Sequence, residues 1–182
     1  MGKITFVLGG ARSGKSAWAE ARAFEMERSG SSVVYLATCE YRADDAEMCD
    51  RISRHRSRRP SAWRTVEEPY GIEDVVARLD AGSVALVDCL SLWVSNLLLM
   101  TPEQGDSGIA DSVLGRVRAF LDAAKRSSGD VIVVSNETGC GVVPSSHLGR
   151  LYRDILGWAN QEAAQAADEA WFLVAGLPQR LK

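Results

Sequence analysis

The sequence predicts a single α/β domain, residues 1–182, in which a mostly parallel sheet carries helices on both faces. Three observations support this fold class: short apolar runs rich in β-branched residues, helical spacing of apolar residues between the runs, and a glycine-rich loop directly after the first run. Strands that alternate with helices form parallel sheets, because the helices make the crossover connections and cover the sheet. A chain of 182 residues is also the size of one domain.

The expected strands are apolar runs bounded by Gly, Ser, Asp or Glu, namely Ile4 to Leu8, Val33 to Thr38, Val84 to Val87, Val131 to Val134 and Trp171 to Val174. A further short edge strand is expected at Arg64 to Glu67. Helical spacing occurs in residues 72–79 and 113–124, and another helix is expected to begin near Leu90. Thr101 to Ile109 contains one proline and two glycines, which predicts a mobile surface loop.

Composition and charge exclude several classes of partner. The net charge of -3 argues against binding to the nucleic-acid backbone or an anionic membrane surface, so any anion site must be local. The apolar stretch Val84 to Met100 contains Asp88 and Asn96 and is too short to span a membrane. The 4 cysteines are scattered without the spacing of a zinc site. We therefore expect free thiols and a cytoplasmic protein.

The strongest motif lies directly after the first expected strand, where residues 9–16 fit the pattern G-x-x-x-x-G-K-[ST]. Glycines let consecutive backbone N–H groups surround a phosphate, and the following helix N-terminus adds partial positive charge. A lysine at this spacing reaches the β- and γ-phosphates of ATP or GTP. The residues expected to bind the triphosphate are Gly9, Gly10, Ala11, Arg12, Ser13, Gly14, Lys15 and Ser16.

An acidic residue at the end of a neighbouring strand usually completes a phosphate-loop site by holding Mg²⁺. Asp88 ends the expected strand that begins at Val84, and Ser16 supplies the hydroxyl that such loops offer to the metal. We therefore predict that Ser16 and Asp88 bind Mg²⁺. Asp88 could also cap the helix that begins near Leu90, and the two roles are compatible.

A basic segment interrupts this otherwise acidic sequence. Residues 51–59 hold five arginines and His55, one of only 2 histidines in the chain. Neighbouring cations favour neutral imidazole, which keeps a ring nitrogen free to attack phosphorus. The other interpretation is a solvated helical face balanced by nearby acids, and spacing alone slightly favours this second interpretation. His147 follows Ser145 and Ser146 at an expected helix start, where a structural role or a minor substrate contact is expected.

Three stretches together resemble one family. They are the phosphate loop, residues 55–69 with His55, Pro60 and Trp63, and residues 135–144, which read Ser-Asn-Glu-Thr-Gly-Cys-Gly-Val-Val-Pro. The sequence is similar to bifunctional adenosylcobinamide kinases and adenosylcobinamide-phosphate guanylyltransferases of cobalamin (vitamin B12) assembly over nearly the whole chain. The phosphate loop alone is generic, whereas the other two stretches are specific to this family.

The resemblance implies a RecA-like P-loop fold, a homotrimer, and two reactions. In such enzymes the aminopropanol hydroxyl of adenosylcobinamide is phosphorylated, and GMP is then transferred from GTP onto that phosphate through a guanylylated histidine, which corresponds to His55. The family's nucleotide contacts outside the phosphate loop correspond by position to Thr38, Cys39, Glu40, Arg56, Ser57, Arg58, Arg59, Glu67 and Asp88. Lys15 and His55 are the expected catalytic residues, with GTP, ATP and Mg²⁺ as the small molecules bound.

The sequence is compatible with several alternatives. The chain could be an ordinary small-molecule kinase whose arginine segment is only a lid, or a nucleotide-dependent switch that does not consume GTP. The loop from Asn136 to Pro144 follows an expected strand end, so it could contact corrinoid or nucleotide, or merely form a glycine turn. Trp63 is expected in the core rather than as a base-stacking platform. The sequence does not decide the phosphate donor of the kinase step or the corrinoid-binding residues.

Overall fold

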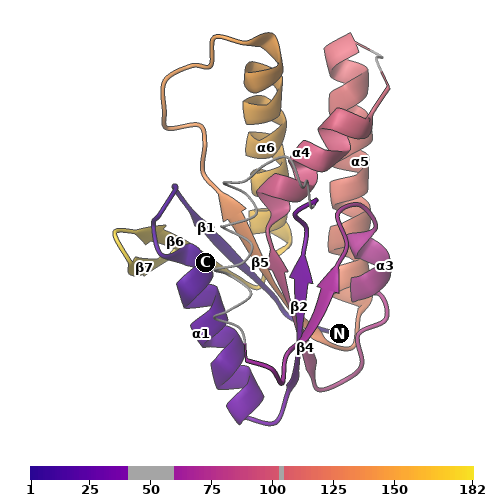
Figure 1. Ribbon diagram of the computed structural model, residues 1–182, viewed down its shortest axis with the longest axis vertical. Coiled ribbons are helices and arrows are strands. Elements are labelled where there is room, and N and C mark those ends of the chain that lie inside the picture. The colour runs from indigo at the N-terminus through magenta and orange to yellow at the C-terminus, as the bar shows by residue number, and fades with distance from the viewer. Residues whose placement is uncertain (41–59, 103–104) are drawn as a thin grey trace.

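The computed structural model describes residues 1–40, 60–102 and 105–182. In chain order the elements are β1 (Ile4–Gly9), α1 (Lys15–Arg28), β2 (Ser32–Ala37), β3 (Arg64–Glu67), α3 (Ile72–Val76), β4 (Ser83–Asp88), α4 (Leu90–Met100), α5 (Gly105–Arg126), β5 (Asp130–Asn136), α6 (His147–Ala166), β6 (Glu169–Val174) and β7 (Leu177–Arg180). Figure 1 shows a twisted sheet with helices on both sides. The predicted α/β class is confirmed.

The strands form one seven-stranded sheet in the order β3-β2-β4-β5-β1-β6-β7. All pairs are parallel except β6 with β7, which are antiparallel. Each strand expected from the sequence is present with ends shifted by at most a few residues, and β3 lies at an edge as expected. Because β1 lies between β5 and β6, the first strand of the chain pairs on both sides with strands that come much later in the sequence.

Alternating side chains give the sheet two apolar faces. On β1, Phe6 packs into the cluster that contains the buried residues of α3, α4, α5 and α6, whereas Val7 packs into the cluster with Ala19 and Ala23 of α1. This alternation follows from the two-residue period of a strand. In Figure 1, α1 accordingly lies apart from the group formed by α3, α4, α5 and α6. Strand β4 is buried along Ser83 to Val87, as expected for a strand covered on both faces.

One boundary predicted from the sequence is wrong. The expected surface loop Thr101 to Ile109 is cut short, because α5 begins at Gly105 and includes Ile109. Gly105 has a positive φ of 73°, a conformation that suits glycine at a helix boundary. Asp106 lies in the first turn of α5, where a carboxylate interacts favourably with the helix dipole.

None of the helices within residues 1–40, 60–102 and 105–182 has both the length and the apolar character needed to cross a bilayer.

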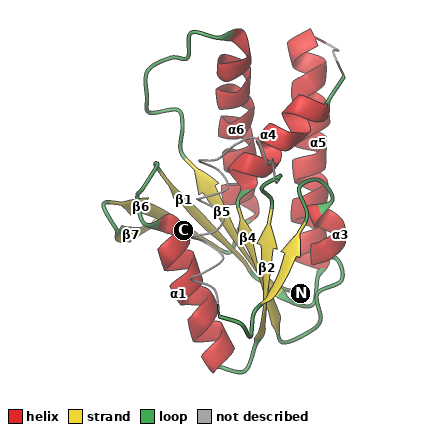
Figure 2. Cartoon of the chain, viewed as in Figure 1, coloured by secondary structure: helices red, strands yellow, loops and turns green. Residues whose placement is uncertain are grey.

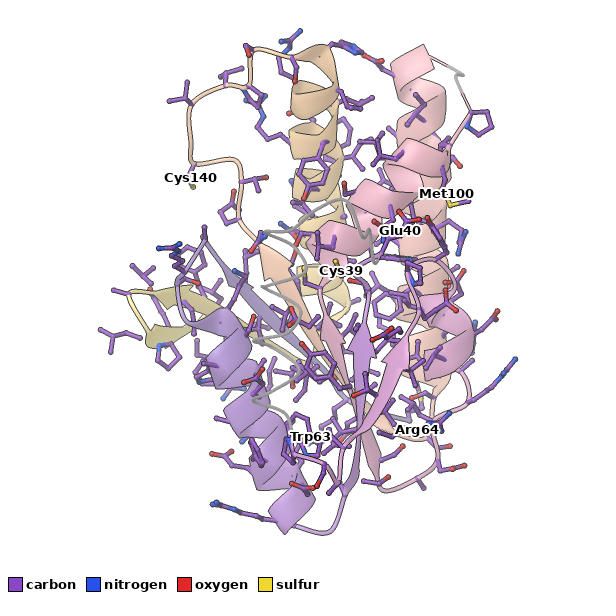
Figure 3. The ribbon with its side chains drawn as sticks, viewed as in Figure 1. Cys39, Glu40, Trp63, Arg64, Met100 and Cys140 are labelled. Carbon is purple, nitrogen blue, oxygen red and sulfur yellow. The ribbon has the colours of Figure 1, made fainter. Side chains whose placement is uncertain are left out.

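Trp63 is buried in the apolar cluster that contains Ala19 and Ala23 of α1. Its ring centroid lies 4.7 Å from that of Phe24, which confirms its expected place in the core. Figure 3 shows Trp63 beside α1, far from the strand ends that carry Cys39 and Glu40.

Candidate nucleotide-binding site

The phosphate loop connects β1 to α1, as the sequence predicts. Arg12 and Gly14 have positive φ values of 57° and 93°, and the Ser13 N–H donates to the Gly10 carbonyl at 3.3 Å. Lys15 is only 7% exposed, and its Nζ donates to the Gly10 carbonyl oxygen at 3.1 Å, across the loop. The Lys15 side chain therefore lies across the loop, where the phosphates of a bound nucleotide would lie.

The loop has a support that the sequence reasoning missed. Strands β6 and β7 form a hairpin whose turn residues, Ala175 and Gly176, both have positive φ, and the Gly176 N–H donates to the Ser13 carbonyl at 2.8 Å. A Cβ on Gly14 would lie 3.0 Å from Gly176 Cα, so the two turns touch through glycine backbones. The signal available in the sequence was a glycine two residues after the expected strand end at Val174.

The sheet register aligns the other predicted residues along the same edge. Ala37 pairs with both Glu67 and Asp88, while Gly9 pairs with Asn136. Residues at the carboxyl ends of parallel strands share one edge of the sheet, which is where open α/β folds bind ligands. The structure thus places the phosphate loop, the segment after β2, Glu67 and Asp88 along one edge.

Asp88 ends β4 and accepts a hydrogen bond from the Tyr35 hydroxyl of the neighbouring strand. Helix α4 has Cys89 as its N-cap residue and no side-chain cap, so the alternative role of Asp88 as that cap is wrong. Tyr35 was not predicted as a site residue, and its only signal was a phenol in an otherwise apolar strand. The Asp88 carboxylate and the Ser16 hydroxyl are hard oxygen ligands that suit Mg²⁺.

Cys89 lies next to Asp88 and is 6% exposed. Burial, with the Asp88 carboxylate as a second cause, raises the pKa of the Cys89 thiol to about 11, so the thiol is neutral at physiological pH. Its Sγ lies 2.9 Å from the Ser91 hydroxyl. Cys39, Cys89 and Cys140 are all free thiols, which confirms that expectation for the described cysteines.

Thr38 links the ends of β2 and β4 by hydrogen bonds. Its fully buried hydroxyl donates to the Cys89 carbonyl and accepts from the Cys89 N–H, both at 2.8 Å. Its own N–H donates to the Asp88 carbonyl at 3.2 Å, and its carbonyl accepts from Asn96 at 2.8 Å. The fold therefore engages every polar group of Thr38, and its predicted contact with nucleotide stays a prediction.

Cys39 and Glu40 follow Thr38 at the carboxyl edge of the sheet, below α4 in Figure 3. The Cys39 thiol lies 3.6 Å from the Glu40 carbonyl oxygen, and the Glu40 carboxylate accepts from the Tyr70 hydroxyl at 2.9 Å. Tyr70 comes from the turn after β3, so this contact joins two strand ends. Both residues lie at the edge that carries the phosphate loop, and their contacts with nucleotide stay predictions.

The remaining predicted residues are His55, Arg56, Ser57, Arg58 and Arg59. They lie outside the described residues, and so do the other arginines of the basic segment. The only described histidine is His147, which is the first residue of α6 as predicted. Its Nε2 lies 2.9 Å from an Asp106 carboxylate oxygen at the start of α5.

Figure 2 shows the loop that leaves β5 and leads to α6 as a long excursion from the sheet. Its base is fixed by Asn160 of α6, a buried residue that the sequence reasoning also missed. Asn160 accepts from the Ser135 hydroxyl at 2.6 Å and donates to the Asn136 carbonyl at 3.0 Å. The exposed part of the loop includes Val142, Val143 and Cys140.

The fold and this edge define a P-loop nucleotide-binding protein of the α/β class. Two solved structures share the fold. The first is the flagellar accessory protein FlaH of Methanocaldococcus jannaschii, with a TM-score of 0.50 and 15% identity, covering 99% of this chain and 78% of that chain. The second is described as an ATPase domain, with a TM-score of 0.53 and 13% identity, covering 93% of this chain and 68% of that chain. At these identities the likeness concerns the fold alone.

A family model described as cobinamide kinase / cobinamide phosphate guanyltransferase matches residues 5–181. The chain belongs to this family. It is 46% identical over 178 residues to the bifunctional adenosylcobalamin biosynthesis protein CobP of Pseudomonas aeruginosa, covering 97% of this chain and 95% of that protein. It is 37% identical over 186 residues to the bifunctional adenosylcobalamin biosynthesis protein CobU of Escherichia coli, covering 98% and 99%. The resemblance noted in the sequence is confirmed.

Proposed function

We propose that this chain phosphorylates adenosylcobinamide and then transfers GMP from GTP to the resulting phosphate, giving adenosylcobinamide-GDP. The observation that carries the proposal is a complete phosphate loop, with Lys15 directed over it, in a chain that matches this family from residue 5 to residue 181. The same edge of the sheet carries Asp88 at the end of a neighbouring strand. Both are features that phosphoryl transfer requires.

In the kinase step, the acceptor hydroxyl attacks the γ-phosphorus and its proton passes to a base. The bond from the γ-phosphorus to the bridging oxygen breaks, and the nucleoside diphosphate is released. The loop N–H groups and Lys15 hold the phosphates and stabilise the charge that develops on them. Ser16 and Asp88 would hold Mg²⁺, which supplies further neutralisation of the phosphate oxygens when bound. The donor is ATP or GTP, and turnover measured with each would distinguish them.

In the second step, a ring nitrogen of His55 attacks the α-phosphorus of GTP and pyrophosphate leaves. A phosphate oxygen of adenosylcobinamide phosphate then attacks the same phosphorus, and the imidazole departs. The covalent intermediate divides one difficult transfer into two displacements. Arginines 56, 58 and 59 would stabilise the charge on the phosphates, with Ser57, Glu67 and the segment 38–40 as further nucleotide contacts.

Labelling with GTP that carries a radioactive α-phosphate tests the histidine intermediate. A phosphoramidate between GMP and imidazole is stable in alkali and labile in mild acid. We expect label to remain on the denatured protein at high pH, to leave in acid, and to be absent from His55→Ala.

The matched control for this experiment is His147→Ala. The His147 side chain is 66% exposed and pairs with Asp106, so its loss should leave labelling unchanged. Acid-labile label in His55→Ala would overturn the assignment of the nucleophile. Failure of the unmodified protein to take up label, with kinase activity intact, would favour the simple kinase. Binding of GTP without product in the presence of adenosylcobinamide would favour the switch.

The resemblance to the family also supports a homotrimer in the cytoplasm, and free thiols at Cys39, Cys89 and Cys140 suit a reducing compartment. Light scattering on a size-exclusion column would give three times the mass of one chain if the trimer forms.

A further inference from the structure

The residue that follows β5 occupies a central place in the proposed site. Strand β5 lies between β1, which leads into the phosphate loop, and β4, which ends at Asp88. Glu137 is the first residue beyond β5, and its N–H donates to the carbonyl of Gly9, the last residue of β1, at 3.0 Å. Its backbone is therefore joined directly to the base of the phosphate loop.

The strand end before Glu137 is held by buried hydrogen bonds. Ser135 is fully buried, Asn160 is 6% exposed, and their hydrogen bond continues from Asn160 to the Asn136 carbonyl. The Asn136 side-chain oxygen is buried without a partner within the described part of the chain. Buried acceptors without partners cost free energy and tend to occur where function requires a particular arrangement. This strand end thus keeps one buried polar atom, the Asn136 side-chain oxygen, that the described fold does not use.

The Glu137 carboxylate is itself oriented by the chain. One oxygen accepts from the Gly139 N–H at 2.5 Å. Among the described residues, no hydrogen bond reaches the other carboxylate oxygen. The side chain is partly exposed, so a substrate can reach it.

Three other carboxylates predicted as site residues at this edge fit the role of a base less well. Asp88 accepts from the Tyr35 hydroxyl and is the candidate metal ligand, and Glu67 lies on the edge strand β3, which three strands separate from β1. Glu40 follows β2, which β4 and β5 separate from β1, and its carboxylate accepts from the Tyr70 hydroxyl at 2.9 Å. Of the four, only Glu137 has a backbone hydrogen bond to the strand that carries the phosphate loop. A carboxylate that accepts the proton of the substrate hydroxyl is a recurring part of kinase sites.

We infer that Glu137 is the general base of the kinase step, an inference that rests on the proposed function. The acceptor hydroxyl oxygen bonds to the γ-phosphorus, its O–H bond breaks, and the proton passes to the free Glu137 oxygen. The bond from the γ-phosphorus to the bridging oxygen breaks, and the nucleoside diphosphate leaves with that electron pair. The guanylyl-transfer step does not use Glu137, because its acceptor is already an ionised phosphate.

Glu137→Gln tests the inference, because glutamine keeps a carbonyl oxygen for the Gly139 N–H but cannot take a proton. We expect kcat for phosphorylation of adenosylcobinamide to fall by about 10²- to 10⁴-fold. Triphosphate Kd, and guanylyl transfer to supplied adenosylcobinamide phosphate, should stay within about two-fold. Glu162→Gln is the matched control, since Glu162 pairs with Arg118 on the surface, and its kinase rate should not change.

The outcomes separate this inference from the proposed function. An unmodified protein that neither phosphorylates adenosylcobinamide nor transfers GMP would overturn the proposed function. A normal kinase rate in Glu137→Gln, with both activities present in the unmodified protein, would overturn the role of Glu137 alone. Equal loss of both activities and of triphosphate binding would show a structural role and overturn it too. If Glu137→Gln does not fold, Glu137→Ala with added formate replaces it, and recovery of part of the kinase rate is expected, whereas no recovery counts against the base.

Discussion

The two faces of the sheet differ in what covers them and in what they carry. The face that includes Phe6 packs against four described helices, α3 to α6, and forms the larger apolar cluster. The face that includes Val7 packs against α1, the helix whose first residue is Lys15. One side therefore provides most of the buried apolar residues, and the other carries the helix that begins at the phosphate loop. Stability and nucleotide binding should accordingly respond to different substitutions.

The largest expected effect on stability is Trp93→Ala on the four-helix face. Trp93 is fully buried, meets Phe120 edge-on at 5.6 Å between ring centroids, and donates from Nε1 to the Tyr70 carbonyl at 2.8 Å. We expect a loss of about 3–5 kcal/mol in the free energy of unfolding. Urea unfolding measures this loss, and the folded fraction should still bind triphosphate.

Trp158→Ala is the control for this substitution, because Trp158 is 46% exposed and should cost well under half as much. A change below about 1 kcal/mol for Trp93→Ala would show that this face does not dominate stability, and the comparison of the two faces would fail.

Lys15→Ala should separate function from stability on the other face. The buried ammonium contacts the Gly10 carbonyl and is costly to desolvate, so its removal should change the free energy of unfolding by less than about 1 kcal/mol or raise it. Turnover of the triphosphate should fall by about 10²- to 10³-fold, because a charge that stabilises the transition state is lost. Urea unfolding and steady-state assays measure the two effects.

Lys125→Ala, at an exposed position near the end of α5, is the matched control and should alter neither quantity. Near-normal turnover in Lys15→Ala would contradict the assignment of the phosphate loop.

The smallest expected effect concerns the start of α6. The Ser146 hydroxyl accepts from the Gly149 N–H at 3.1 Å and so caps this helix. Ser146→Ala should lower the free energy of unfolding by about 1 kcal/mol. Thermal unfolding compared with Ser145→Ala, whose hydroxyl makes no hydrogen bond to any described residue, gives the measurement. If both variants were equally stable, the Ser146 cap would make no contribution to the free energy of unfolding.

The sequence predicted those parts of the fold that are encoded locally. Buried strands such as β4 and β5 appear as continuous apolar runs, because both of their faces are covered. Strand β7 was missed, because Leu177–Arg180 is exposed throughout and contains Pro178, so neither alternation nor a run marks it. The start of α5 was missed because the two glycines in its first turn are typical of loops.

The candidate site shows the same division. The phosphate loop and Asp88 could be predicted, because a motif and a strand end mark their positions. The contacts of Tyr35 with Asp88 and of Asn160 with Ser135 join residues far apart in the chain, and no local pattern records such pairs. Thr38 was predicted as a nucleotide contact from its position in the family alone. Its two hydrogen bonds to the Cys89 backbone could not be predicted in that way.

The hairpin that supports the phosphate loop bears on the order in which the chain acquires its parts. The loop follows β1, yet β5, β6 and the Gly176 turn that hold it come much later in the chain. Contacts between residues distant in sequence form slowly, because the entropy of closing the intervening chain opposes them. During synthesis on the ribosome, a segment that emerges early must therefore wait for one that emerges much later before it takes its final shape. We therefore expect tight nucleotide binding only after β5, β6 and the Gly176 turn have paired with β1 and its loop.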